Sequence, residues 1–120
     1  MCIRDREYAV HYARLVDFLR GKRPEAKMLL LLTTPVRDRA SLERFDARNE
    51  RVIGRNKWAR EIAGARGIEV IDLYSLLENR PELYSPDGVH LRAEGYALLA
   101  GRIARAIRGE TLAQGAIEVV

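Results

Sequence analysis

The chain has 120 residues, 48% of them hydrophobic and 32% charged, a composition typical of one globular domain with a modest core. Its longest apolar run, from Met28 to Leu32, is far shorter than the ~20 residues of a membrane-spanning helix, so we predict no membrane span. The single cysteine, Cys2, excludes a disulfide within the chain.

The net charge of +4 raises the question of an anionic partner. However, basic and acidic residues alternate along the chain, as they do from Arg44 to Arg51, and no basic cluster is interleaved with aromatic residues. We therefore predict a solvated surface of mixed charge and no nucleic-acid partner.

The first half of the chain predicts a helix, a buried strand and a second, longer helix. Apolar residues three or four apart favour a helix over residues 8–19. The leucine-rich segment 27–33 is bounded by turn residues and has the length of a strand that is buried on both faces. From about Leu42 the helical spacing returns, and it predicts a helix that continues to Gly64.

The second half predicts another buried strand and a final helix. Residues 68–73 are rich in β-branched side chains, and residues 75–79 can form a helical turn. Apolar residues at helical spacing between Tyr96 and Ile107 predict the last helix, which Gly109 ends. Strand, long helix and strand form a βαβ unit, so the two strands are expected to be parallel. A sheet of two parallel strands is too narrow to cover the apolar faces of three helices, so we expect the chain to be part of a larger α/β fold.

The loop before the last helix contains the strongest candidate for chemistry. Asp87 precedes His90 by three residues with Gly88 between them, so its carboxylate can fold back onto one ring nitrogen of the histidine. In a hydrolytic triad such a carboxylate orients the histidine, whose other nitrogen removes the proton of a serine hydroxyl. The alternative is a surface ion pair or a helix cap. We expect no metal, because two ligands are too few for zinc and the other histidine, His11, has no ligand-type residue one turn further along its helix. No organic cofactor is expected either.

Four other polar residues have weaker functional interpretations. Asn49 and Asn56 are seven residues apart on the long helix, and we expect them to tie it to adjacent loops by hydrogen bonds rather than to bind substrate. Asp72 follows a strand, where catalytic residues of α/β sheets often lie, but a capping role is favoured. Arg37 is expected to face solvent, with contact to an anionic or sugar substrate as the alternative.

Residues 84–107, YSPDGVHLRAEGYALLAGRIARAI, resemble the last block of the SGNH, or GDSL, hydrolases, in which an Asp-x-x-His loop precedes an apolar helix. Segments 23–39 and 48–77 are similar to that family's preceding strand, its Pro-containing loop, its long helix and its next strand. The resemblance implies a three-layer α/β/α, flavodoxin-like parallel sheet, truncated at the N-terminus. It also implies that Asp87 and His90 are catalytic and that the partner is a small-molecule ester, such as an acetylated sugar, a lipid or a thioester.

The sequence departs from the family pattern in its other catalytic motifs. The family's nucleophilic serine in a Gly-Asp-Ser motif is not found here, nor are its oxyanion-hole glycine and asparagine. Ser41, Ser75 and Ser85 do not lie in a glycine-flanked strand-to-helix turn, so we do not expect a nucleophile among them.

We therefore expect one partial domain: residues 1–6 non-native, residues 7–109 family-like and residues 110–120 a tail. In this interpretation the chain is a fragment of a serine ester hydrolase, inactive alone, that supplies the Asp-x-x-His part of the triad. The alternative is a non-catalytic α/β binding or interaction module in which Asp87 and His90 only cap and pair.

Overall fold

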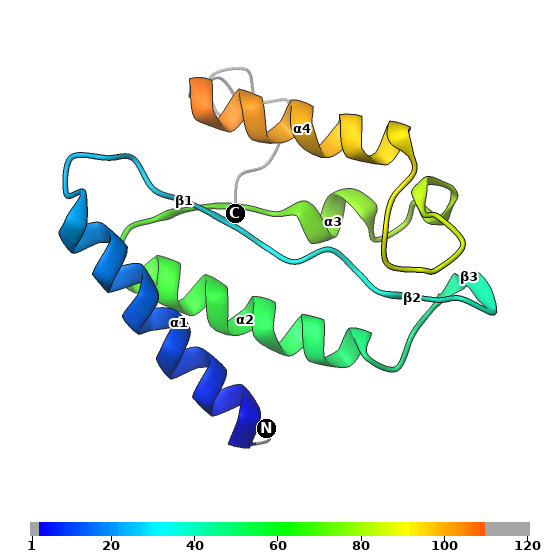
Figure 1. Ribbon diagram of the computed structural model, residues 1–120, viewed down its shortest axis with the longest axis horizontal. Helices are drawn as coiled ribbons and strands as arrows, with labels where there is room; N and C mark the ends of the chain where they lie inside the picture. Colours follow the sequence, from blue (N-terminus) through cyan, green and yellow to red (C-terminus); the bar gives the residue numbers. More distant parts are fainter. Residues whose placement is uncertain (1–2, 110–120) are drawn as a thin grey trace.

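A two-stranded parallel sheet lies at the centre of the computed structural model, which describes residues 3–109 (Figure 1). In this sheet β1 (Leu29–Leu31) pairs with β4 (Glu69–Ile71), and Leu30 lies opposite Val70. Because successive side chains of a strand point to opposite faces, both faces of the sheet carry apolar residues. The predicted parallel pairing is confirmed, although each strand is shorter than its predicted segment.

Helices cover both faces of this sheet. α1 (Ile3–Lys22) and α2 (Asn49–Ala65) pack on one face, and α4 (Ala93–Arg108) lies across the other (Figure 1). The core on the α1 and α2 side consists of aliphatic and alanine side chains: Val16, Leu30, Leu32, Ala59, Ile62, Ala63, Ile68 and Val70. The core on the α4 side is centred on Ile71, Leu73 and Ala106. The result is the three-layer α/β/α arrangement expected from the sequence.

Helices form where the spacing of apolar residues predicts them, but their ends differ from the predicted ranges. α1 already begins at Ile3, although the residues up to Arg6 show no helical pattern of their own. The predicted turn after β4 is the short helix α3 (Leu73–Leu77). α4 ends at Gly109, whose φ of 73° is the left-handed conformation of a helix C-cap. No helix within residues 3–109 is long and apolar enough to cross a membrane.

The prediction of a helix from Leu42 is wrong, because a small antiparallel hairpin occupies this segment. β2 (Arg37–Asp38) pairs with β3 (Ser41–Phe45), and α2 begins only at Asn49. The Asp38 carboxylate accepts a hydrogen bond from the Ala40 amide at 2.8 Å and so stabilises the tight turn between the two strands. Leu42 and Phe45 have helical spacing, but local turn chemistry and strand pairing decide the conformation.

Candidate active site

One closed loop between α3 and α4 brings Asp87 and His90 together. The Ser85 amide donates to the carbonyl oxygen of His90 at 2.9 Å, and Tyr84 and Leu91 form an antiparallel bridge just outside that bond. The loop is preceded by the 3-10 helix η1 (Pro81–Leu83). Backbone hydrogen bonds at its base therefore hold the loop in a defined turn.

Asp87 and His90 form a direct hydrogen bond, as the sequence predicts. His90 Nδ1 lies 2.6 Å from Asp87 Oδ2, a distance typical of a charge-assisted bond. The amides of Val89 and His90 and the hydroxyl of Ser85 all donate to Asp87 Oδ1, each at 2.9 Å. The hydrogen bond from His90, followed by those from the two amides, holds the pKa of Asp87 well below its usual value. Since an ionised carboxylate only accepts hydrogen bonds, the proton of the neutral His90 ring lies on Nδ1.

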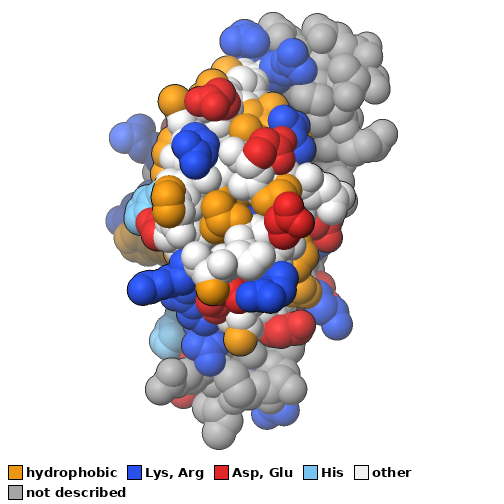
Figure 2. All heavy atoms as spheres, turned by 90° about the vertical axis from the view of Figure 1, so that its right-hand side faces the viewer, with side chains coloured by type: hydrophobic (Ala, Val, Ile, Leu, Met, Phe, Trp, Pro, Cys, Tyr) orange, Lys and Arg blue, Asp and Glu red, His pale blue; other side chains and the backbone are white. Residues whose placement is uncertain are grey.

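The second ring nitrogen of His90 is accessible. The His90 side chain is 71% exposed, and within residues 3–109 its Nε2 atom has no hydrogen-bond partner. With the proton on Nδ1, Nε2 carries the lone pair and can act as a base. Figure 2 shows this end of the molecule, where acidic and basic side chains alternate between apolar ones, as the interleaved charges of the sequence predict.

The turn that carries the pair rests on the segment after β1. The Arg37 amide donates to the carbonyl oxygen of Gly88 at 2.8 Å. Gly88 is buried and has a φ of 77°, in the left-handed region that favours glycine. A Cβ atom at this position would lie 2.1 Å from the Arg37 carbonyl oxygen, so only glycine fits between the two backbones.

Arg37 does not face solvent, and this sequence-based expectation is wrong. Only 2% of the residue is exposed, and its guanidinium lies over the rings of Phe45 and Tyr84, 4.7 and 5.3 Å from their centroids. The guanidinium donates to three backbone carbonyl oxygens, those of Leu42, Leu77 and Glu78. Two of these carbonyls lie at the end of α3, where helical carbonyls lack intrahelical donors. The sequence does not reveal these acceptors, because they are backbone atoms up to 41 residues away.

The serine hydroxyls make local hydrogen bonds. Ser85 Oγ donates to Asp87 and lies 3.1 Å from the carbonyl oxygen of His90, while Ser75 Oγ donates to Asp72 at 2.6 Å. Ser41 lies at the start of β3. Among residues 3–109, no serine hydroxyl is hydrogen-bonded to His90 Nε2.

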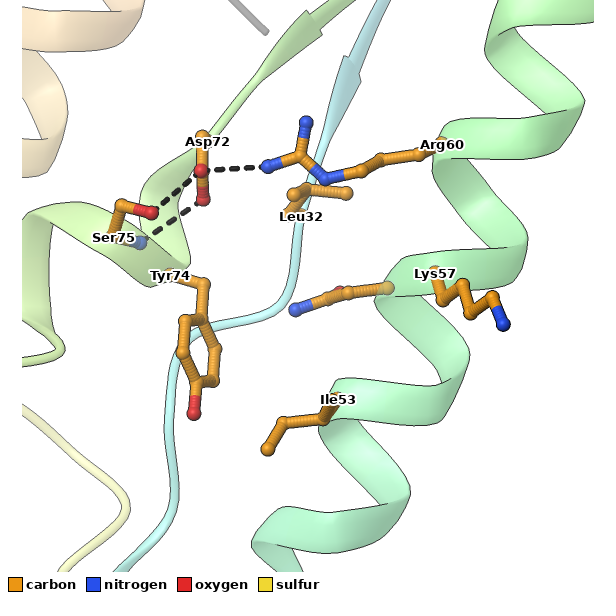
Figure 3. A pocket seen from close by; sticks show the side chains of 8 residues that line it. Leu32, Ile53, Lys57, Arg60, Asp72, Tyr74 and Ser75 are labelled. Carbon is orange, nitrogen blue, oxygen red and sulfur yellow. Dashed lines mark hydrogen bonds and ion pairs between the residues drawn. The ribbon is translucent and has the colours of Figure 1, made fainter.

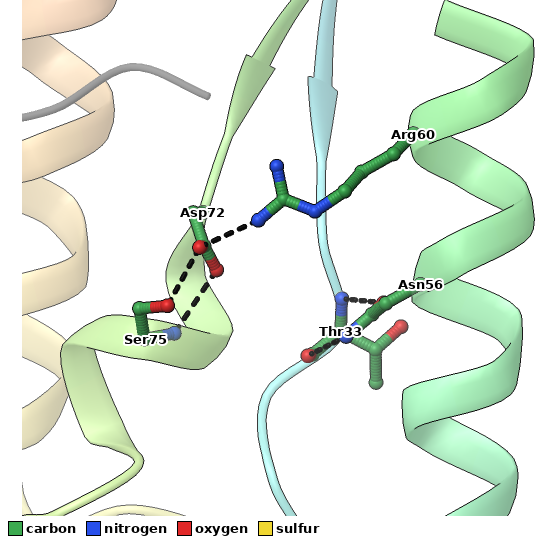
Figure 4. Close-up of polar contacts among 5 residues, drawn as sticks. All are labelled: Thr33, Asn56, Arg60, Asp72 and Ser75. Atoms are coloured by element: carbon green, nitrogen blue, oxygen red, sulfur yellow. Dashed lines mark hydrogen bonds and ion pairs between the residues drawn. The ribbon is translucent and has the colours of Figure 1, made fainter.

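A hollow of about 260 Å³ lies between α2 and α3, near the carboxyl ends of β1 and β4 (Figure 3). Asp72 on its rim accepts from the Ser75 amide at 3.0 Å, which caps α3, and from Arg60 Nη2 at 2.7 Å (Figure 4). The capping role predicted for Asp72 is therefore confirmed. The residues that line this hollow are Leu32, Ile53, Asn56, Lys57, Arg60, Asp72, Tyr74 and Ser75.

Two buried asparagines of α2 hold the chain that leaves β1, which confirms the predicted hydrogen-bonding role. Asn56 accepts from the Thr33 amide and donates to the Thr33 carbonyl oxygen, both at 2.9 Å (Figure 4). Asn49 accepts from the Val36 amide at 2.9 Å and donates to the Tyr74 hydroxyl at 2.8 Å. The two side chains thereby fix the segment that leads to Arg37.

The parallel sheet with helices on both faces makes this an α/β protein with three layers, and the Asp–His pair lies in the loop before its last helix. The model of the GDSL-like lipase/acylhydrolase family matches residues 2–98, and the chain belongs to this family. No curated protein is matched.

Two solved structures show the same fold. One is the esterase domain of the ORF1 protein from the zebrafish ZfL2-1 retrotransposon, with a TM-score of 0.77 and 21% identity over 90% of this chain and 61% of that chain. The other is LAE5, an alpha/beta hydrolase enzyme from the metagenome of Lake Arreo in Spain, with a TM-score of 0.66 and 22% identity over 92% of this chain and 49% of that chain. The chain thus spans about three fifths of the first structure and about half of the second. These likenesses confirm the SGNH-type α/β fold expected from the sequence.

Proposed function

We propose that Asp87 and His90 are the acid–base pair of a serine ester hydrolase. The observation that supports this proposal is the 2.6 Å bond between His90 Nδ1 and the ionised Asp87, because in the neutral ring it places the lone pair on the exposed Nε2. In this function Nε2 takes the proton of a serine hydroxyl while the serine oxygen attacks the ester carbonyl. The imidazolium, which Asp87 stabilises, then protonates the leaving alcohol, and water hydrolyses the acyl-enzyme by the reverse proton movement.

We propose further that the nucleophile and the oxyanion-hole donors come from residues outside these 120. The three serines of the chain lie outside a Gly-Asp-Ser context, and the hydroxyls of Ser75 and Ser85 are directed at local acceptors. Without a nucleophile no acyl-enzyme forms, and without oxyanion donors the tetrahedral intermediate loses its main electrostatic support. The substrate in this proposal is a small-molecule ester.

The test compares the 120-residue chain with a chain extended by upstream residues that carry a Gly-Asp-Ser motif, using p-nitrophenyl acetate. We expect no turnover above buffer from the short chain and saturable turnover from the extended one. His90→Ala should abolish that turnover. His11→Ala, which removes the other histidine from an exposed position on α1, is the matched control and should have no effect. Turnover that persists in the His90 variant, or no turnover in the extended chain, would overturn the proposal.

A further inference from the structure

We infer that Arg37 is a positioning residue for the Asp87–His90 pair, because its backbone supports Gly88 and its guanidinium keeps that support in place. The inference rests on the function proposed above and extends it to a residue outside the Asp-x-x-His loop.

The first step of the argument is the contact between the two backbones. The Arg37 amide donates to the Gly88 carbonyl oxygen at 2.8 Å, and the Gly88 amide donates to the Ser85 carbonyl oxygen at 3.1 Å. Gly88 stands between Asp87 and Val89, whose amide donates to the Asp87 carboxylate. A shift of Gly88 therefore moves both the carboxylate and one of the donors that orient it.

The second step concerns the Arg37 side chain. Its guanidinium donates to carbonyls of β3 and of the end of α3, so it connects the hairpin to the helix that precedes the loop. It also lies over the ring of Tyr84, the residue at the base of the loop, whose hydroxyl donates to the Pro35 carbonyl oxygen at 2.7 Å. One side chain thus links the segment after β1, the end of α3 and the entrance to the loop.

The third step is the kind of side chain that this position requires. Burying a cation is unfavourable, and the hydrogen-bond acceptors of Arg37 are neutral carbonyls rather than a carboxylate. The guanidinium combines a planar face for two aromatic rings with a fixed fork of donors, and a lysine ammonium has neither property. The position therefore depends on arginine geometry and not on positive charge alone.

The experiment measures the order of the loop by NMR in the 120-residue chain, at a concentration where sedimentation shows a monomer and without any need for turnover. Arg37→Met should accelerate amide exchange of Val89 and His90 at least tenfold and remove the downfield resonance of the His90 Nδ1 proton. The rates of amide exchange in the centre of α2 should stay within twofold of those in the unsubstituted chain. Arg102→Met is the matched control, because Arg102 is a buried arginine of α4 with 3% exposure, and it should leave Val89 and His90 exchange unchanged.

A second variant covers the case in which Arg37→Met loses the whole fold. Arg37→Lys keeps the charge and much of the length, and it should still raise the exchange of the two loop amides several-fold while α2 remains protected. Unchanged loop exchange and an unchanged Nδ1 resonance in Arg37→Lys would overturn the inference.

The extended chain separates this inference from the proposed function. There Arg37→Lys should lower kcat about 10–100-fold, as expected for a misplaced base, with KM within twofold. If the Arg37 variants disorder the loop but His90→Ala remains active, the catalytic proposal fails and the positioning role stands. If His90→Ala is inactive but the Arg37 variants leave loop exchange and kcat unchanged, the positioning role fails alone.

Discussion

At the scale of single residues, the Asp87 carboxylate is held from several directions at once. It accepts from the His90 ring, from two backbone amides and from the Ser85 hydroxyl. The amides and the hydroxyl orient Asp87 independently of the imidazole, so the carboxylate stays in place when the ring changes its protonation state. The His90 ring, in contrast, is hydrogen-bonded by Asp87 alone among the side chains of residues 3–109.

This difference predicts unequal effects of the two substitutions in an extended, active chain. His90→Ala removes the group that moves the proton in both directions and should abolish most of kcat. Asp87→Asn should cost less or at most a comparable factor, because the Val89 and His90 amides still hold the side chain at position 87. Steady-state kinetics and a thermal melt of each variant provide the check, and the melting temperatures should change little. Near wild-type kcat in His90→Ala would leave the loop as a helix-capping turn.

Tyr84 predicts a pH dependence of stability at the alkaline side. Burial of this fully enclosed side chain raises the pKa of its hydroxyl to about 12, above the value of 10.0 for an exposed tyrosine. Because the folded state favours the protonated phenol, this contribution to stability is fully present below pH 10 and decreases as the pH rises towards 12. The loss of melting temperature between pH 9 and pH 11.5 should therefore be smaller in Tyr84→Phe. An absorbance titration in which Tyr84 ionises near pH 10 would contradict this expectation.

At the scale of elements, the sequence predicts the parts whose conformation follows from their own side chains. β1 and β4 are apolar on both faces, and α4 has a regular apolar stripe that ends at Gly109, so their positions can be predicted. The β2–β3 hairpin is too short for a clear period, and it depends on a turn that Asp38 stabilises. Asp87 and His90 could be predicted because they are three residues apart. Arg37 could not, because its acceptors are backbone carbonyls of other elements.

Glycines in two different elements, the loop and α4, predict opposite outcomes when they are replaced by alanine. Gly88→Ala places a Cβ atom 2.1 Å from the Arg37 carbonyl oxygen at a positive φ, and it should lower the free energy of unfolding by about 1–3 kcal/mol or more. Gly101→Ala, on α4 with open space around the position, should raise it by about 0.5–1 kcal/mol. Urea unfolding of both variants is the measurement. An unchanged stability in Gly88→Ala would show that the two backbones can separate.

At the scale of the whole molecule, the central sheet has edges that no other strand of residues 3–109 covers. Within residues 3–109 it contains two strands, so β1 and β4 each pair on one side only, and Leu31 of β1 is 41% exposed. α1 also presents apolar side chains to solvent, with Leu15 at 54% and Phe18 at 59% exposure. Unpaired strand edges and apolar helix faces favour association with another chain.

We therefore predict that the isolated 120-residue chain self-associates or is only marginally stable. Its mass in sedimentation equilibrium should rise with concentration. Leu31→Lys, which places a charge on the free edge of β1, should reduce that rise. A compact monomer with a cooperative melt at every concentration would contradict this prediction and would weaken the interpretation of the chain as part of a larger domain.

The asparagine bonds between α2 and the segment after β1 also set a length. Asn49 and Asn56 are separated by seven helical residues, a rise of about 10.5 Å, and their partners Val36 and Thr33 by three residues, about 10 Å when extended. The distance between the two asparagines along α2 therefore matches the extended length of the chain between Thr33 and Val36. Many different side chains should therefore be tolerated between Thr33 and Val36. Adding or removing one residue there would break the hydrogen bonds of Asn49 or those of Asn56 to this segment, and it would shift the Arg37 backbone that contacts Gly88. This constraint on spacing would restrict insertions and deletions in this segment more than substitutions.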